Sequence, residues 1–113
     1  MSKADVTDTA LIDAIREMEQ GLIDADLGGH LFKKRVALHG QGKRGGARTI
    51  VASKIQGRWF FLYGFLKNER DNISNIELKA LQGLAKQLLE LSDAQLKKAL
   101  LANDITEVHH EQN

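Results

Sequence analysis

The chain has 113 residues, of which 42% are hydrophobic and 27% charged, and its formal net charge is +1. This length suits one globular domain with its own core, and no apolar run approaches the roughly 18–20 residues of a membrane span. The N-terminal segment MSKADVTDTA has no apolar signal core, so we expect a cytoplasmic, bacterial-type protein. Because the chain has no cysteine, it can form neither disulfides nor thiolate metal sites.

The small net charge hides an uneven distribution of charge along the chain. Residues 31–68 contain nine basic residues and no acidic residue. Residues 1–26 carry seven acids and two bases, and residues 69–113 carry eight acids and five bases. A cationic centre between acidic flanks predicts a site for a polyanion, in particular nucleic acid.

The first predicted element is an amphipathic helix that begins near residue 8. Apolar residues recur at three- and four-residue spacing, at Leu11, Ile12, Ile15, Met18, Leu22 and Ile23. Thr7 or Asp8 would cap its N-terminus, and Gly21 lies where it would end. We expect this helix to cover the core and to have no chemical role.

Three strands are predicted next, after a turn over residues 24–29 that contains Gly28-Gly29. Alternation with β-branched and aromatic residues indicates a strand over residues 31–38, and a hairpin over residues 47–54 and 58–66 that turns at 55–57. Strict alternation in the last strand places one set of side chains on one face, namely Trp59, Phe61, Tyr63 and Phe65. Phe60, Leu62 and Gly64 would lie opposite, and most aromatic rings would pack in the core, leaving some for base stacking or a partner.

The connection over residues 39–46 contains four glycines and two bases. Such a loop can bring backbone N–H groups and cations against phosphate oxygens, but glycine-rich hairpin loops also arise for steric reasons alone. It is not a P-loop, because the spacing from glycine to Gly-Lys-Ser/Thr is missing.

The rest of the chain is predicted to be mostly helical. Ser74 and Glu77 form a capping box before an apolar helical stripe, a shorter helix begins at Ser92-Asp93, and residues 105–108 could add a short edge strand. The adjacent His109 and His110 lack the geometry of a preformed metal site. This order predicts an α+β fold, with an antiparallel sheet of three to four strands and helices packed over one face.

Three segments together resemble a known family: GKRGGARTIV (42–51), FFLYGFLKNERDNIS (60–74) and ELKALQGLAKQLLELSDAQL (77–96). Their combination of Gly-Gly-x-Arg with Tyr-Gly-x-x-Lys-Asn-Glu is similar to the RelE/HigB-like toxins of type II toxin–antitoxin modules, in the branch once catalogued only as a domain of unknown function. The resemblance covers about residues 20–108. It implies a RelE/ParE-like toxin fold in a single domain over residues 1–113, with 1–7 and 109–113 expected to be disordered.

The resemblance implies a ribosome-dependent mRNA endoribonuclease that inhibits translation, neutralised by a helix-turn-helix antitoxin that also binds operator DNA. In such an enzyme the RNA 2′-hydroxyl attacks the adjacent phosphate, and cations stabilise the dianionic transition state without a metal or other cofactor. Arg48 matches the arginine that these toxins keep on that strand. The implied catalytic residues are Arg48, Lys33, Lys67 and Asn68, and the implied RNA-binding residues are Lys34, Arg35, Lys43, Arg44 and Lys54.

The chain departs from the family pattern in two ways. Family members usually open with a strand before the first helix, and this strand is apparently missing, which would leave a sheet edge open to a partner or to a second copy in a homodimer. Many relatives also use a tyrosine or histidine near the C-terminal end as acid or base. Here the chemical candidates are His30, His39 and Tyr63, with Tyr63 expected to pack, and Glu69, expected to pair with Arg70 or Lys67.

These departures keep a second hypothesis open, namely a non-catalytic binding protein on the same scaffold. It could be a gyrase-directed toxin of the ParE type or a truncated module that binds only antitoxin or RNA. A third hypothesis, an unrelated structural protein, explains the helices but neither the segregation of charge nor the combination of motifs.

Overall fold

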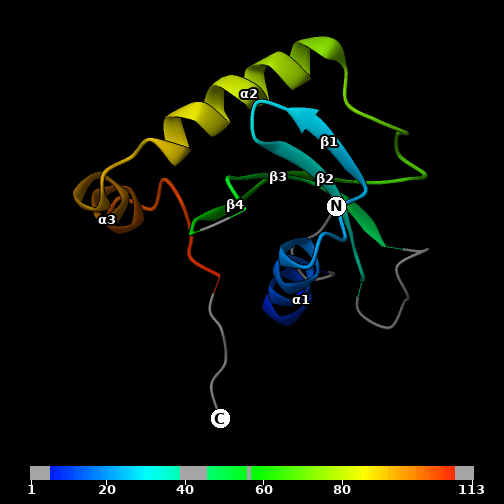
Figure 1. The fold of residues 1–113 in the computed structure, drawn as a ribbon, viewed down its shortest axis with the longest axis horizontal. Helices are drawn as coiled ribbons and strands as arrows, with labels where there is room; N and C mark the ends of the chain where they lie inside the picture. The colour runs from blue at the N-terminus through cyan, green and yellow to red at the C-terminus, as the bar shows by residue number, and fades with distance from the viewer. Residues whose placement is uncertain (1–5, 39–45, 56, 109–113) are drawn as a thin grey trace.

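The computed structural model describes residues 6–38, 46–55 and 57–108. Its elements are α1 (Asp8–Glu19), β1 (Ala25–Gly28), β2 (Leu31–Val36), β3 (Ala47–Ser53), β4 (Trp59–Leu66), α2 (Asn75–Leu89) and α3 (Asp93–Leu101). The strands form one antiparallel sheet in the order β1-β2-β3-β4, with β1 and β4 at its edges (Figure 1). The predicted α+β class is therefore confirmed. The predictions for His39, Lys43, Arg44 and the His109-His110 pair concern residues outside the described ranges.

Local sequence signals locate the helices well. Thr7 caps α1 by accepting a hydrogen bond from the Ala10 N–H (3.1 Å). Capping boxes begin both C-terminal helices, formed by Ser74 with Glu77 in α2 and by Ser92 with Gln95 in α3. Arg58 fixes the approach to α3 by donating to the Leu91 carbonyl and to Asp93 Oδ1.

Two short segments differ from their predicted structure. Most of the predicted turn over residues 24–29 is strand β1, because this segment hydrogen-bonds back onto β2 and the reversal is confined to Gly29 and His30. Gly28, Gly29 and His30 all have φ between 60° and 79°, so the reversal requires the left-handed conformation that glycine adopts readily. The predicted strand at residues 105–108 does not form, because neither edge strand of the sheet pairs with it.

The helices cover both faces of the sheet, so the prediction that they pack over one face is wrong (Figure 1). On one face α1 places Ala14 and Met18 against the sheet, and on the other α2 places Ala85 against it. The reason is that both faces are apolar: the fully buried Ile50 and Val51 are neighbours on β3 and therefore point to opposite faces. Each face needs a helix to exclude water.

A β-bulge in β4 changes which aromatic side chains share a face. Ile50 pairs with Tyr63, but the next residue of β3, Val51, pairs with Phe61, so Leu62 is an extra residue. Side-chain alternation is reset at such a bulge. The pairing register between β3 and β4 therefore decides toward which face the side chains after Leu62 point. Alternation within β4 alone does not decide it.

As a result, the strict alternation predicted for β4 is wrong. Trp59 and Phe61 pack toward α1, whereas Phe60, Leu62 and Phe65 pack toward α2. Tyr63 lies on the α2 side with Phe65, with 6.1 Å between the ring centroids. The bulge thus moves the tyrosine and the last phenylalanine to the face that α2 only partly covers.

Lys34 belongs to the interior beneath α1. Its side chain points to the face opposite Lys33 and Arg35, the residue is 4% exposed, and its Nζ lies 2.8 Å from Glu17 Oε1 of α1. Thr49 Oγ1 donates to the Lys34 carbonyl (2.9 Å). This ammonium therefore joins α1 to the sheet.

We expect Glu17→Gln to lower the free energy of unfolding by about 1–3 kcal/mol, because a buried ammonium would lose its charged partner. Chemical denaturation measures the change. Glu19→Gln, an exposed change on the same helix, is the matched control and should alter stability by less than about 0.5 kcal/mol. Equal stability of the two variants would show that the pair does not hold α1 on the sheet.

Candidate nucleic-acid interface

The α2-side face of the sheet is divided into an apolar half and a basic half. Toward one end, α2 packs on Leu31 and Ala52. Toward the other end the face carries Lys33, Arg35 and Arg48, all partly exposed. We call this second half the basic face; it is defined by these three residues together with Tyr63 and Phe65 of β4.

The strand register fixes how these side chains neighbour one another. Arg35, Arg48 and Phe65 are directly opposite one another across β2, β3 and β4, and Lys33, Ile50 and Tyr63 form the adjacent row. Residues that are diagonal neighbours on two adjacent strands have Cα atoms about 7–8 Å apart. Lys33 and Tyr63 are both diagonal to Arg48, on either side of the fully buried Ile50.

The cations of the basic face are held in different ways. Arg35 is anchored at the β1 edge, where its Nε lies 3.0 Å from Asp24 Oδ1 and its backbone N–H donates to Asp24 Oδ2 (2.7 Å). Arg48 donates from Nη1 to the Gly46 carbonyl (3.3 Å). Among the described residues, no carboxylate pairs with Lys33 or Arg48. Their charges are therefore available to an anionic ligand.

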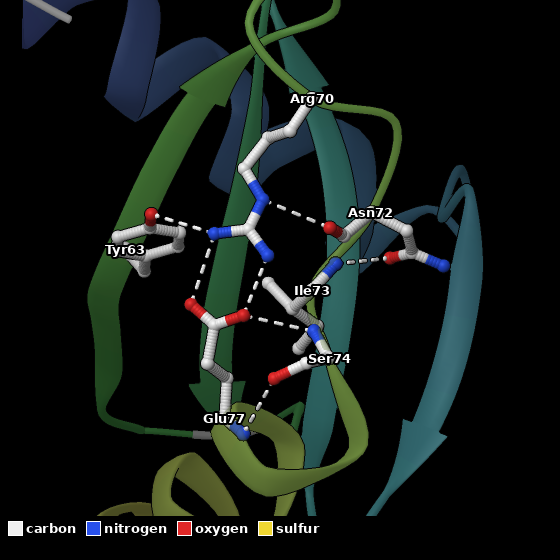
Figure 2. Close-up of polar contacts among 6 residues, drawn as sticks. All are labelled: Tyr63, Arg70, Asn72, Ile73, Ser74 and Glu77. Carbon is white, nitrogen blue, oxygen red and sulfur yellow. Dashed lines mark hydrogen bonds and ion pairs between the residues drawn. The ribbon is translucent and has the colours of Figure 1, made fainter.

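Arg70, from the segment between β4 and α2, lies over the aromatic part of this face (Figure 2). It binds Glu77 through two hydrogen bonds, Nη2 to Oε1 (2.5 Å) and Nη1 to Oε2 (2.9 Å). Its Nε donates to the Asn72 carbonyl (2.9 Å) and its Nη1 to the Tyr63 hydroxyl oxygen (3.2 Å). The guanidinium carbon is 6.0 Å from the centroid of Tyr63 and 5.8 Å from that of Phe65.

The Arg70–Glu77 pair is charged over the whole ordinary pH range. Hydrogen bonds from Arg70, and next from the Ser74 backbone, lower the pKa of Glu77 from 4.5 to about 2. Hydrogen bonds to Glu77 and to Tyr63 raise the pKa of Arg70 above its usual value. Since Glu77 also accepts the Ser74 N–H in the capping box (2.8 Å), one carboxylate ties Arg70 to the start of α2.

The remaining predicted site residues are scattered around the sheet. Lys67 and Asn68 are exposed directly after β4, at the end of the sheet that holds Arg48, since Leu66 pairs with Ala47. Lys54 is exposed beyond the other end of β3, about 20 Å from Arg48 along the strand. The fold therefore brings Lys67 and Asn68, but not Lys54, to the basic face.

Lys34 was expected to bind RNA, but it lies on the opposite face and is buried against Glu17. Side-chain alternation in a strand separates it from its neighbours Lys33 and Arg35. It is therefore not part of the basic face.

Sequence reasoning missed the cluster of Tyr63, Arg70 and Glu77. Tyr63 was expected to pack, yet it is 39% exposed. Glu69 was expected to pair with Arg70 or Lys67, but its Oε1 accepts the Leu66 N–H (3.0 Å) and Glu77 takes Arg70. The available signal was an arginine seven residues before the capping-box glutamate.

Within the described residues, no group of three or more His, Asp or Glu side chains is placed to hold a metal ion. No helix in the described part of the chain is long and apolar enough to cross a membrane.

The fold and the basic face define an α+β protein with a cationic sheet surface suited to a polyanion. The family model described as "RelE toxin of RelE / RelB toxin-antitoxin system" matches residues 1–108. The chain belongs to this family, so it is the toxin of a toxin–antitoxin system and its partner is an antitoxin. Comparison with curated proteins and with solved structures gives no match.

We expect Glu77→Gln to lower the melting temperature at pH 7, because glutamine keeps the capping box but removes the charge that holds Arg70. Since the pKa of Glu77 is lowered from 4.5 to about 2, its stabilising effect is fully present above pH 4.5 and lost as the pH falls toward 2. The difference in melting temperature between wild type and variant should therefore shrink across that interval. Asp71→Asn, which removes an exposed carboxylate from the same segment, is the control. A difference that stays constant down to pH 2 would contradict this role.

Proposed function

We propose that this toxin is a ribosome-dependent mRNA endoribonuclease that inhibits translation, and that the basic face is its active site. The observation that carries the proposal is the position of Lys33 and Arg48, which are diagonal neighbours on adjacent strands with no carboxylate partner among the described residues. Two cations so placed can bind one phosphate group from two sides.

In the proposed reaction the RNA 2′-hydroxyl oxygen attacks the adjacent phosphorus and the bond from phosphorus to the 5′-oxygen breaks. The products are a 2′,3′-cyclic phosphate and a 5′-hydroxyl end. Negative charge builds up on the phosphoryl oxygens in the transition state, and preorganised cations stabilise it more than they stabilise the ground state. We assign this stabilisation to Arg48 and Lys33.

The RNA on either side of the reacting phosphate is proposed to run along the same end of the sheet. Lys67 and Asn68 would hold it where β4 ends, and Arg35 would contact it at the β1 side. We propose Lys43 and Arg44, in the connection between β2 and β3, as further backbone contacts. Phosphate contacts of this kind fix the position of the strand and carry no sequence information.

The partners follow from the same proposal. The ribosome would present the mRNA, and a helix-turn-helix antitoxin that also binds operator DNA would neutralise the toxin. The outer edge of β4 is unpaired within the described part of the chain, which supports pairing with a strand of a second copy in a homodimer.

The test is induced expression in a bacterial host with mapping of mRNA 5′ ends. Wild type should produce new ends within translated regions, and Arg48→Ala should reduce their rate of formation by about 100-fold or more. Lys97→Ala is the matched control, because it removes an exposed cation of α3, outside the basic face, and it should cleave like wild type. Thermal unfolding should be similar for all three proteins, since the Arg48 side chain makes one hydrogen bond to Gly46 within the described residues.

Other outcomes would redirect the proposal. Cleavage by Arg48→Ala at the wild-type rate would remove the basic face as the active site. Growth arrest without new ends would favour a gyrase-directed toxin, and a folded protein without any effect would favour a module that only binds antitoxin or RNA.

A further inference from the structure

We propose that the hydroxyl group of Tyr63 donates the proton to the leaving 5′-oxygen in this cleavage, and that the Arg70–Glu77 pair positions that hydroxyl. The inference rests on the proposed nuclease activity and assigns a step that the lysine and arginine residues of the basic face leave open. A guanidinium is permanently protonated under ordinary conditions and is therefore a poor proton donor. Lys33 is assigned to stabilising the charge on the phosphoryl oxygens, so we assign the protonation of the leaving oxygen to a separate group.

Tyr63 lies on the basic face together with Lys33 and Arg48. The bulge at Leu62 brings the ring to the same face as Lys33 and Arg48, in the row Lys33–Ile50–Tyr63. Its Cα is a diagonal neighbour of that of Arg48, at about 7–8 Å. A phosphate bound between Lys33 and Arg48 would therefore lie within reach of the partly exposed phenol.

The hydrogen bond from Arg70 constrains the direction of the phenolic hydrogen. Arg70 Nη1 donates to the Tyr63 oxygen at 3.2 Å, and a guanidinium offers no acceptor in return. The hydrogen of the Tyr63 hydroxyl therefore points away from Arg70, and it makes no hydrogen bond to another of the described residues. It is free to be donated to an oxygen of the substrate.

Arg70, which donates to the Tyr63 hydroxyl, is itself held by several hydrogen bonds. The Arg70 guanidinium lies between the Tyr63 ring and the Glu77 carboxylate (Figure 2), held by two hydrogen bonds to Glu77 and one to the Asn72 carbonyl. Because Glu77 neutralises its charge and occupies both of its terminal nitrogens, Arg70 is better suited to hold Tyr63 than to bind phosphate. We therefore treat Arg70 and Glu77 as positioning residues.

Other candidates for this step are less well placed. The Glu69 carboxylate accepts the Leu66 backbone N–H. His30 lies at the opposite end of the sheet, where its carbonyl accepts the Ser53 N–H (3.0 Å).

The 2′-hydroxyl gives up its proton to water as its oxygen bonds to phosphorus. The bond between phosphorus and the 5′-oxygen breaks, and its electron pair stays on the 5′-oxygen. The Tyr63 O–H bond breaks and its proton joins that oxygen, which leaves as a hydroxyl. The phenolate left on Tyr63 accepts the existing hydrogen bond from Arg70, which is stronger to an anion than to a neutral oxygen, and water returns the proton after product release.

The test uses full-length protein and ribosomes carrying an mRNA in which the cleaved bond has been mapped. Tyr63→Phe removes only the hydroxyl and should slow cleavage by about 100-fold or more, the usual contribution of general acid catalysis, without weakening binding to the ribosome–mRNA complex. A second mRNA carries sulfur in place of the bridging 5′-oxygen at that bond. Because a thiolate leaves without a proton, wild type and Tyr63→Phe should cleave this mRNA at similar rates.

The positioning pair is tested in the same assay. Glu77→Gln keeps the capping box but weakens the hold on Arg70, so it should slow cleavage of the oxygen-bridged mRNA and leave the sulfur-bridged mRNA unaffected. Lys97→Ala, which removes an exposed cation of α3, is the control and should match wild type on both.

Several outcomes would overturn the inference. Wild-type rates from Tyr63→Phe on the oxygen-bridged mRNA would exclude the hydroxyl as the acid while leaving the nuclease proposal intact. An equal loss on both mRNAs would show that Tyr63 acts in binding or structure. Absence of cleavage of either mRNA by wild type would instead refute the nuclease itself, and with it this step.

Discussion

The ion pair between Arg70 and Glu77 joins the first turn of α2 to the segment that follows β4. Glu77 is part of the first turn of α2, where it completes the capping box with Ser74, and the same carboxylate binds Arg70 at the end of the segment that follows β4. Arg70 in turn lies over Tyr63 and Phe65. The start of the helix is thereby fixed beside the aromatic end of β4, and α2 runs from there over the apolar half of the face.

The basic face exists because successive basic side chains of β2 point to opposite faces of the sheet, where some are exposed and one is buried. Lys33 and Arg35 point to the α2 side, while Lys34, between them, points to the α1 side and is neutralised by Glu17. A buried ammonium without that carboxylate would be costly. Two successive basic residues therefore have unrelated roles, one in holding a helix and one in presenting charge.

Much of the fold could be predicted because its signals are local. Thr7, Ser74 and Ser92 cap the helices that their neighbouring sequence predicts, and the hairpin of β3 and β4 follows from alternation and a turn. The placement of Arg48 on a strand beside the basic β2 also follows from the pattern. The two-sided burial of β3 was not predicted, since a short apolar run does not show how many helices cover it.

The candidate site was predicted only in part, because its missing members depend on tertiary structure. Whether Tyr63 faces α1 or α2 depends on a single extra residue in the register with β3, which no pattern within β4 reveals. The burial of Lys34 depends on where α1 docks. The pairing of Arg70 with Glu77 bridges an irregular segment, so neither helical nor strand spacing indicates it.

The most direct test of the account is the chemical identity of the RNA ends that the purified toxin produces on ribosome-bound mRNA. Attack by the 2′-hydroxyl must give 5′-hydroxyl ends and 2′,3′-cyclic phosphates, which adapter ligation detects only after enzymatic end repair. We expect these ends. Products with 5′-phosphate and free 3′-hydroxyl ends would show that another nucleophile attacks the phosphate, and would contradict the assignment of the basic face to this reaction.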